Sequence, residues 1–309
     1  MVAAGLDRLP QPGSGQTLAR WRALSTVAEL DLSLVKLFEG HTDALAILAE
    51  LGGPAAPAGS RWGTWCAEPP DARLEFVSDG ERRGIRIEGT KAWCSGAASV
   101  THAVVSGWNE DGEPCLAAVR LALPGVEVTA LGWEAVGMAG CASVDVRFDG
   151  ARAEQLGAAG DYIRRAGFWH GGAGIAACWF GGAQAIANMA REVSQGSREP
   201  HRLAHLGAID VALAGAAAVL REAAAAIDAW PQANAEALAL RTRLAVEAAA
   251  DTVLRHAGRA LGAGPLCRNA RFARAMADLP VFMRQSHAER DLATLGQHVA
   301  QAGSGAWLL

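Results

Sequence analysis

The chain has 309 residues, a formal net charge of −4 and an apolar fraction of 51%. A chain of this length forms one large domain or two to three small ones, and its apolar side chains suffice for a substantial core. Basic residues are not concentrated in any segment, which argues against a nucleic-acid-binding protein. The N-terminus lacks a basic stretch followed by a long apolar run, and no uncharged stretch has the length of a membrane span. We therefore expect a cytoplasmic protein without a signal peptide.

The cysteines are spread along the chain and include no Cys-x-x-Cys pair. This spacing supports neither a zinc ribbon nor a thioredoxin-type redox motif, and we predict no metal site. Buried free thiols in a reducing compartment are the expected state. The residues concerned are Cys66, Cys94, Cys115, Cys141, Cys178 and Cys267.

Three kinds of pattern follow one another along the chain. Residues 16–52 repeat apolar side chains at helical spacing and end in a Gly- and Pro-rich linker. Between about residues 62 and 148, short alternating apolar runs predict an all-β unit, sandwich or barrel. Asp79-Gly80 and Asp111-Gly112 mark two hairpin turns within it.

The remainder of the chain is predicted to be helical. Helices are expected over 168–193, 204–230, 236–261 and 272–299, because Pro200, Pro231 and the Gly-Pro run at 262–265 interrupt the pattern. Four helices of this length with short joints predict an antiparallel four-helix bundle. The fold class is thus α+β and multidomain, with a short N-terminal helical region (1–60), a central β domain (61–155) and a C-terminal bundle (156–309).

The segment Gly89-Thr-Lys-Ala-Trp-Cys-Ser-Gly-Ala97 ends a predicted strand. Its Trp93, followed two residues later by Ser95, fits a flat redox-active ring, because the indole covers one face and the hydroxyl bonds to the edge. Ordinary core packing of the tryptophan is the competing interpretation. The sequence contains no strand–Gly-x-Gly-x-x-Gly–helix unit and no Gly-x-x-x-x-Gly-Lys, so neither a Rossmann site nor a P-loop is predicted.

This order of elements and five local segments resemble the acyl-CoA dehydrogenase family. The segments are Trp65-Cys-Ala-Glu-Pro69, Lys91-Ala-Trp-Cys-Ser-Gly96, Val136-Gly-Met-Ala-Gly-Cys-Ala-Ser143 with Val146-Arg-Phe148, Leu261-Gly-Ala-Gly264, and Arg274 with Ala277-Asp278. The resemblance extends over nearly the whole chain from about residue 16. It implies a flavoprotein with FAD bound between the β domain and the bundle.

By this resemblance, the cofactor-binding residues are those that match the family's flavin contacts. The glycine pair would let backbone amides approach the adenosine or diphosphate, although an ordinary helix C-cap explains these glycines equally well. The matching positions are Trp65, Cys66, Ala67, Trp93, Ser95, Gly262 and Gly264.

The sequence departs from the family pattern at several positions. Ala67 stands where the family has a flavin-bonding threonine, and Pro70-Asp71-Ala72 replaces the usual Gly-Ser-Asp. The Arg-x-x-Phe-Gly motif, which reaches the flavin diphosphate of a partner subunit, is not recognisable. The N-terminal helical region is also shorter than in the family, which implies a shallow or open acyl pocket.

The catalytic glutamate of the family is missing as well. Its position, eight residues after Asp278, holds Ser286, and the alternative position on the first bundle helix has the basic Tyr162-Ile-Arg-Arg165. Abstraction of an α-proton from an acyl-CoA thioester needs a carboxylate within hydrogen-bond reach. His287 and Glu289 are the nearest candidates, and either would need a shifted loop.

Structural roles compete with these assignments. Glu289 belongs to a group with Arg284 and Asp291 that can form surface ion pairs, and His287 can be an ordinary helix histidine. His170 lines the same cavity in one interpretation, and in the other it lies beside closely packed backbone.

Three functions remain open. The first is α,β-desaturation of an acyl-CoA or acyl-carrier thioester in fatty acid metabolism, with FAD as hydride acceptor and an electron-transfer flavoprotein as partner. The second is a flavin monooxygenase on the same fold, and the third is a catalytically altered member that only binds an acyl group. The resemblance also implies a homodimer or homotetramer, for which the alanine-rich faces 212–218 and 223–226 would allow close helix approach.

Overall fold

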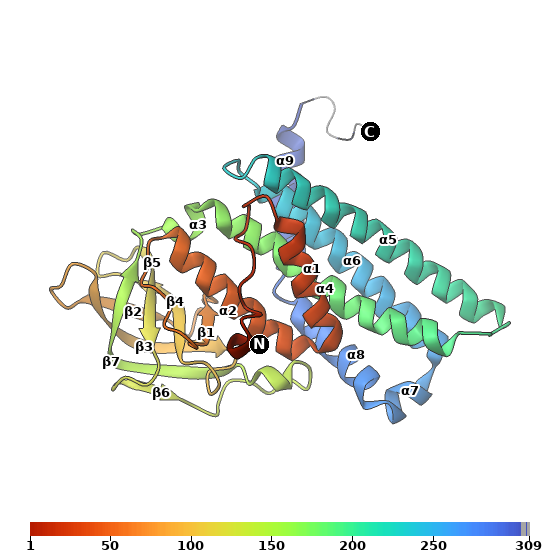
Figure 1. Cartoon of the computed structure of the whole chain (residues 1–309), viewed down its shortest axis with the longest axis horizontal. Helices are drawn as coiled ribbons and strands as arrows, with labels where there is room; N and C mark the ends of the chain where they lie inside the picture. Colours follow the sequence, from red (N-terminus) through yellow and green to blue (C-terminus); the bar gives the residue numbers. More distant parts are fainter. Residues whose placement is uncertain (304–306, 308–309) are drawn as a thin grey trace. The chain divides into compact units, whose positions relative to one another are not determined.

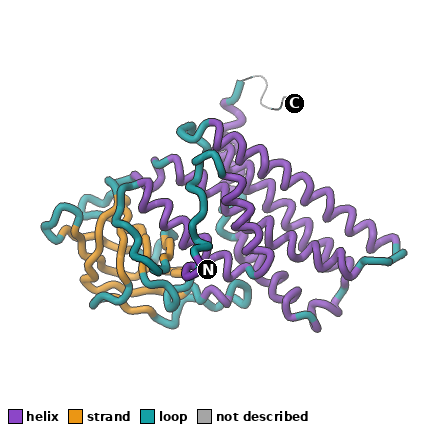
Figure 2. The backbone as a smooth tube through the Cα atoms, in the orientation of Figure 1, coloured by secondary structure: helices purple, strands orange, loops and turns teal. Residues whose placement is uncertain are grey.

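The computed structural model describes residues 1–303 and Trp307, and these residues form two compact units (Figure 1). The first, the barrel unit, consists of Met1–Gln11, Ser33–Ala135 and Ala139–Phe168. The second, the helical unit, consists of Pro12–Leu32, Val136–Met138 and Trp169–Leu309. The strands all belong to the barrel unit, and the helical unit is built from helices and their joints (Figure 2).

The barrel unit contains a seven-stranded sheet in which five strands close on themselves. The closed order is β4-β2-β3-β7-β5, with β5 pairing back to β4, while β1 and β6 extend the sheet at β4 and β7. The predicted β domain is therefore a barrel. The strands are β1 (Trp62–Trp65), β2 (Leu74–Ser78), β3 (Gly84–Cys94), β4 (His102–Trp108), β5 (Pro114–Arg120), β6 (Val126–Val128) and β7 (Val144–Leu156).

Apolar side chains that alternate with exposed ones along the strands fill the interior of the barrel. On β2 and β3, Leu74, Phe76, Ile85 and Ile87 are buried while their neighbours are more exposed, which is the period-two pattern of a sheet with one core face. Both predicted turns join antiparallel pairs, β2 to β3 and β4 to β5.

One N-terminal helix packs on the barrel. Helix α2 (Leu32–Glu50) contributes Ala44, Ile47 and Leu48 to a buried cluster with Trp62 of β1. The Thr64 hydroxyl also donates to the Gly40 carbonyl at 2.7 Å. The first helix, α1 (Thr17–Leu30), belongs to the helical unit, so residues 1–60 do not form a unit of their own.

The helical unit is built on three long helices, α4 (Ala166–Val193), α5 (Pro200–Ala229) and α6 (Glu236–Leu261). Helices α5 and α6 pack along each other, and α1 packs against α5. A buried anchor fixes α1, because Asp228 accepts from the backbone and the hydroxyl of Thr17, the latter at 2.6 Å. Within the described residues, α5 alone is long and apolar enough to cross a membrane by length and composition.

The predicted fourth bundle helix, 272–299, is wrong, because the chain breaks it into α8 (Ala270–Met283) and α9 (Glu289–Gln301). The break follows from interactions distant in sequence. Helix α6 holds the turn, since Arg243 Nη2 donates to the Gln285 carbonyl at 2.7 Å and Glu247 bonds Arg284 at 2.5 Å. Ala288, in a left-handed conformation with φ 46°, then redirects the backbone.

The predicted glycine loop at 262–264 is a loop only at its first residue. Gly262 caps the C-terminus of α6 with φ 66°, and Gly264 lies inside the short helix α7 (Ala263–Arg268). The C-cap alternative therefore describes Gly262 correctly. The remaining helical elements are η1 (Val2–Ala4), η2 (Ala139–Cys141) and α3 (Asp161–Arg164).

Candidate functional site

Trp93 stands out in the barrel unit because of its backbone and its exposure. On β3, Lys91 pairs with Val146 of β7 and Cys94 pairs with Val144, so two residues oppose one in a β-bulge. Within this bulge Trp93 has φ 57°, and it is 50% exposed. A left-handed backbone is a genuine outlier for a bulky residue and costs roughly 1–3 kcal/mol. The chain thus accepts backbone strain to hold an indole outside the core.

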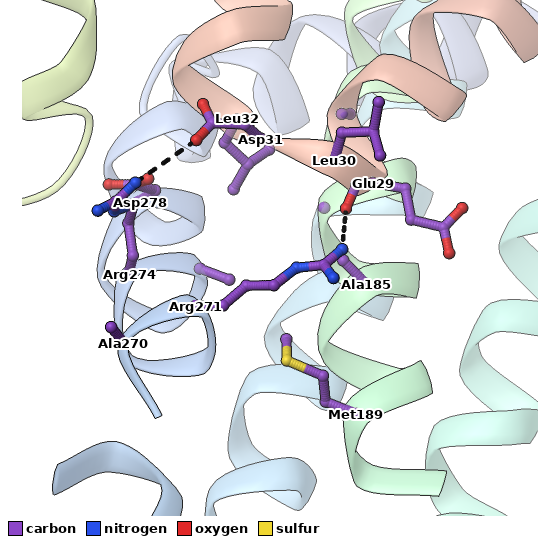
Figure 3. A pocket seen from close by; sticks show the side chains of 13 residues that line it. Glu29, Leu30, Asp31, Leu32, Ala185, Met189, Ala270, Arg271, Arg274 and Asp278 are labelled. Atoms are coloured by element: carbon purple, nitrogen blue, oxygen red, sulfur yellow. Dashed lines mark hydrogen bonds and ion pairs between the residues drawn. The ribbon is translucent and has the colours of Figure 1, made fainter. Parts of the chain in front are cut away.

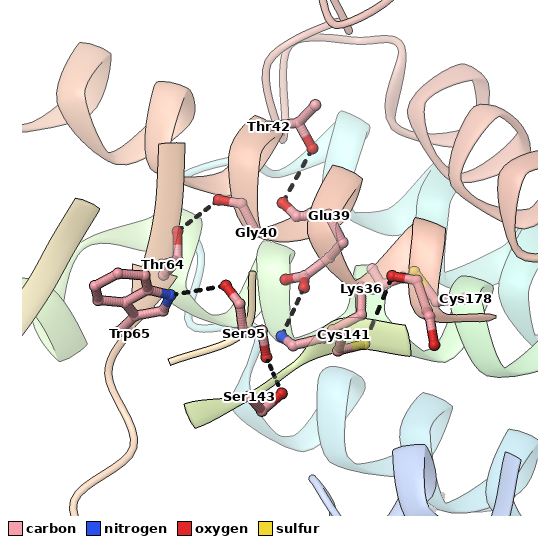
Figure 4. A network of polar contacts seen from close by, with 12 residues as sticks. Lys36, Glu39, Gly40, Thr42, Thr64, Trp65, Ser95, Cys141, Ser143 and Cys178 are labelled. Carbon is pink, nitrogen blue, oxygen red and sulfur yellow. Dashed lines mark hydrogen bonds and ion pairs between the residues drawn. The ribbon is translucent and has the colours of Figure 1, made fainter. Parts of the chain in front are cut away.

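Ser95 lies two residues after Trp93, and its amide donates to the Trp93 carbonyl at 3.0 Å. Its hydroxyl is 2.8 Å from the hydroxyl of the buried Ser143, and its carbonyl accepts the Trp65 indole N–H at 3.1 Å (Figure 4). The next residue along the chain, Gly96, donates its amide N–H to the Cys141 carbonyl at 2.7 Å. Ala142, beside Cys141 in sequence, has a left-handed backbone with φ 42°. Ser95 is thus half-buried and Trp93 half-exposed at the end of the same strand.

The other predicted contacts of the barrel unit have different surroundings. Trp65 does not face outward: it is buried in the barrel core, where its indole N–H bonds the Ser95 carbonyl. Burial raises the pKa of the half-buried Cys66 thiol to about 11, despite nearby Lys91 and a hydrogen bond with Tyr162. Ala67 is exposed and offers no side-chain hydrogen bond.

A buried lysine, to which the sequence analysis assigned no role of its own, connects these segments. Lys91 is 1% exposed and donates to the carbonyl and hydroxyl of Ser106 at 2.9 and 2.8 Å. Glu68 Oε1 is 4.0 Å from the ammonium. Desolvation lowers the pKa of Lys91, partly offset by Cys66 and Glu68. The lysine therefore joins β3 to β4 and attracts the segment that follows β1.

In the helical unit, the predicted bases lie in the turn between α8 and α9. Ser286 is buried and its hydroxyl accepts from the Ala288 amide at 3.2 Å. The His287 side chain is 63% exposed and lies 3.4 Å from Asp291. Glu289 is exposed in the first turn of α9. The structure thus brings His287 and Glu289 into one turn, but both face solvent.

Polar atoms gather around Arg243 on the inner side of the same turn. The guanidinium lies 5.3 Å from the centre of the Trp179 ring, and desolvation lowers its pKa despite Asp291 and Glu247. Within the described residues, four buried atoms of this cluster have no hydrogen-bond partner in the protein: Arg243 Nε, Trp179 Nε1, Glu247 Oε2 and Gln285 Oε1. Two are donors and two are acceptors. Buried groups of this kind usually bond to water or to a ligand.

A cavity of about 230 Å³ opens between α1, α4 and α8 (Figure 3). Arg271 donates to the Glu29 carbonyl at 3.1 Å, and Arg274 lies 3.8 Å from Asp31. Asp278 on its wall accepts from the left-handed Met138 amide at 2.5 Å. Burial raises the Asp278 pKa, and the nearby charge of Asp31 adds to the effect despite that hydrogen bond.

A second, more open cavity of about 290 Å³ lies at the junction of α6, α7 and α8. Gly264 lines it together with Leu261, Pro265, Arg268 and Phe272, and Met189 and Val193 of α4 also contribute. Gly264 therefore borders a cavity, whereas Gly262 is not among the residues that line either one.

No model of a protein family matches the sequence, and no curated protein matches it either. Solved structures do match in fold. Methanesulfinate monooxygenase MsuC from Pseudomonas fluorescens has a TM-score of 0.81 and 20% identity over 97% of this chain and 89% of its own. Nitrososynthase from Micromonospora carbonacea var. africana has a TM-score of 0.79 and 19% identity, over 97% of this chain and 88% of its own.

A third structure was solved with a flavin. TdsC from Paenibacillus sp. A11-2, a dibenzothiophene monooxygenase, was determined with FMN and indole. It has a TM-score of 0.78 and 21% identity over 90% of this chain and 82% of its own. The chain has the acyl-CoA dehydrogenase-type fold. At these identities the similarity establishes the fold alone.

Proposed function

We propose that this protein is a flavin-dependent monooxygenase that uses reduced FMN and molecular oxygen to oxidise a small organic substrate. The observation that carries the proposal is the strained and half-exposed Trp93 beside Ser95. Backbone strain that persists at an exposed aromatic residue is typical of a ligand site, because packing alone would favour a relaxed, buried side chain.

The residues at the end of β3 fit a flavin ring. The Trp93 indole would cover one face of the ring, and the Ser95 hydroxyl would donate to its edge while it accepts from the Ser143 hydroxyl. Ser143 and Trp65 would keep Ser95 in place through the two hydrogen bonds described above. When bound and reduced, the flavin supplies the electrons that place one oxygen atom in the substrate and release the other as water.

Oxygenation fits this chain better than desaturation. Desaturation of an acyl thioester requires a base positioned at the α-proton. The position of the family glutamate holds Ser286, whose hydroxyl already accepts from a backbone amide, and Glu289 and the His287 ring point into solvent. A monooxygenase needs no such carboxylate. The MsuC and TdsC structures, both described as monooxygenases, agree with this choice.

The choice of FMN over FAD follows from contacts that the sequence lacks. FAD carries an adenosine diphosphate half that needs its own binding residues. The Gly-Ser-Asp segment and the Arg-x-x-Phe-Gly motif expected for the diphosphate are absent, and Gly264 lies within a helix rather than a loop. The FMN found in TdsC supports the shorter cofactor.

The Arg243 cluster of the helical unit would bind a small polar ligand of its own. Its unpaired donors and acceptors suit an uncharged polar group, such as a hydroxyl or a carboxamide, that both accepts and donates. The nearby charges of Arg243 and Arg284 are balanced by Glu247 and Asp291, so an additional anion would lack a counter-charge. Acyl-CoA and acyl-carrier substrates remain predictions from the sequence.

Oxygen uptake tests the proposed function. The protein is supplied with FMN and a flavin reductase, and a panel of small thioethers, amines and indoles is screened for oxygenated products. We expect product formation that stops without reduced flavin. Bleaching of protein-bound flavin by an acyl-CoA under anaerobic conditions, without product in the oxygen assay, would instead establish desaturation and contradict the proposal.

A further inference from the structure

The cavity between α1, α4 and α8 contains a buried carboxyl group that the chain satisfies only in part. Asp278 is 3% exposed, and one of its oxygens accepts from the Met138 amide. Among the described residues, this amide is the one hydrogen-bond donor that reaches the carboxyl group. A carboxylate has two acceptor oxygens. Because Asp278 lines the cavity, its second oxygen is left for a donor that the chain does not supply.

The same cavity has room for an organic molecule. Its volume is about 230 Å³, and a cavity of about 150 Å³ already holds a benzene ring. Apolar side chains form much of the wall, with Leu30 and Leu32 on either side of the α1–α2 joint and Ala185 and Met189 on α4 (Figure 3). The residues that line it all differ from those of the Arg243 cluster. A ligand of this cavity therefore combines a polar end with an apolar body.

The charges around Asp278 favour a cation as that polar end. Glu29 and Asp31 line the same cavity, and Asp31 raises the pKa of Asp278 more than Arg274 lowers it. Residues 28–30, the C-terminal end of α1, also form part of the wall, and the last carbonyls of a helix carry partial negative charge. The residues that α4 contributes are uncharged.

The two arginines of the cavity do not make it an anion site. Both are exposed, and each already lies beside an acceptor of the chain. Arg271 donates to the Glu29 carbonyl, and Arg274 lies beside Asp31. An anion next to them would also meet the carboxyl groups of the wall and the negative end of α1. The arginines thus balance the acidic residues that are present before a ligand enters.

We propose that this cavity binds a small organic ammonium ion, which donates to Asp278 and Asp31 and lays its apolar body against α1 and α4. The three N–H groups of a primary ammonium suffice for both carboxyl groups. Binding of the cation ionises Asp278, and the proton of this carboxyl passes to the solvent. The net charge of the site therefore stays the same. This site lies outside the proposed flavin function and does not depend on it.

Calorimetric titration of the whole protein without flavin tests the proposal. The probes are benzylamine and n-butylamine, and the controls are benzyl alcohol and benzoate, which carry a neutral or an anionic group on the same ring. We expect saturable binding of benzylamine and no binding of benzoate. Benzyl alcohol should bind at least about tenfold more weakly, because it lacks the hydrogen bond between two charged groups.

Variants on the whole protein assign the binding to the carboxyl groups. Asp278→Asn keeps an acceptor for the Met138 amide and should weaken benzylamine binding by at least about tenfold. Asp31→Asn should have a smaller effect, since Arg274 shares this carboxyl group. Asp210→Asn removes an exposed acid of α5 and is the matched control, with binding expected as in wild type. Circular dichroism establishes that each variant is folded.

Proton release separates a direct contact from a merely structural role of Asp278. The titrations are repeated in two buffers with different heats of ionisation, which report the protons released. Because burial raises the pKa of Asp278, wild type should release protons on binding benzylamine near about pH 5 and far fewer near about pH 8. Asp278→Asn should release none at either pH.

The apolar part of the site is tested by filling it. Ala185→Leu adds a larger side chain to the wall without changing a charge, and it should abolish binding of benzylamine. Unchanged affinity of this variant would show that the ring binds elsewhere and would overturn the proposal.

Four further results would overturn the proposal. These are no binding of either amine by wild type, equal affinity of wild type and Asp278→Asn, binding of benzoate as tight as that of benzylamine, and binding without proton release near about pH 5. Potassium chloride is titrated as well. Displacement of benzylamine by an equal concentration of potassium ions would assign the site to an inorganic cation instead.

Discussion

Two tryptophans of the same barrel illustrate opposite uses of one side chain. Trp62 on β1 is 2% exposed, donates its N–H to Ser60 at 2.9 Å and stacks on His102 at 4.7 Å. Trp93 at the end of β3 is half exposed and has a left-handed backbone. The packing of Trp62 lowers the free energy of the folded state, whereas the strained backbone of Trp93 raises it. This difference supports the proposal that Trp93 contacts a ligand rather than the core.

The largest expected effect is on stability at the packed tryptophan. Trp62→Ala should lower the free energy of unfolding by about 3–5 kcal/mol, because it removes a large buried ring and its stacking on His102. Chemical denaturation monitored by circular dichroism measures the change. A loss below about 1 kcal/mol would show that the α2–barrel contact does not depend on this ring.

The exposed tryptophan should behave in the opposite way. Trp93→Ala should weaken binding of reduced FMN by roughly 10- to 100-fold, since removing a stacked aromatic typically costs about 1–3 kcal/mol. Its free energy of unfolding should change little. Equal losses of stability at Trp62→Ala and Trp93→Ala would remove the contrast between the two residues.

The backbone strain at Trp93 can be measured separately. Trp93→Gly should be more stable than Trp93→Ala by about 1 kcal/mol, because glycine accepts φ 57° without a steric penalty. The same pair of substitutions at Trp62, which lies in a regular strand, should show the reverse order. Denaturation midpoints of the four variants compare the two positions directly.

Asp278 provides the smallest effect, and it depends on pH. Because burial raises the pKa of the native carboxyl above the ordinary 3.8, the native state holds its proton more tightly than the unfolded chain. The contribution of this raised pKa to the free energy of unfolding is complete below pH 3.8. It is lost as pH rises through the native pKa of Asp278. Asp278→Asn keeps an acceptor for the Met138 amide and should reduce this decline in stability. Thermal midpoints measured from pH 4 to pH 8 would show a parallel decline if Asp278 were not involved.

The order of elements could be predicted from the sequence because it depends on local periodicity. The barrel strands, the hairpins at Gly80 and Gly112, and the helix ending at Leu261 all carry signals within a few residues. The break between α8 and α9 carries no such signal. It depends on Arg243 and Glu247, which lie on α6, about forty positions earlier in the sequence.

The candidate site shows the same limit. Trp93 and Ser95 could be singled out from their spacing, but the left-handed backbone of Trp93 depends on the bulge against β7, a pairing between distant segments. The Arg243 cluster was missed because its members come from α4, α6 and the α8–α9 turn. Only the unpaired buried atoms reveal it, and these exist only in the folded chain.

The most direct test of the account is equilibrium binding of reduced FMN under anaerobic conditions to wild type, Trp93→Ala and Trp230→Ala. Trp230 is also an exposed tryptophan, but it lies at the C-terminal end of α5 and has a negative φ. We predict stoichiometric binding by wild type and Trp230→Ala, with at least tenfold weaker binding by Trp93→Ala. Absence of binding by wild type, or equal affinity in all three proteins, would contradict the assignment of Trp93 to a flavin.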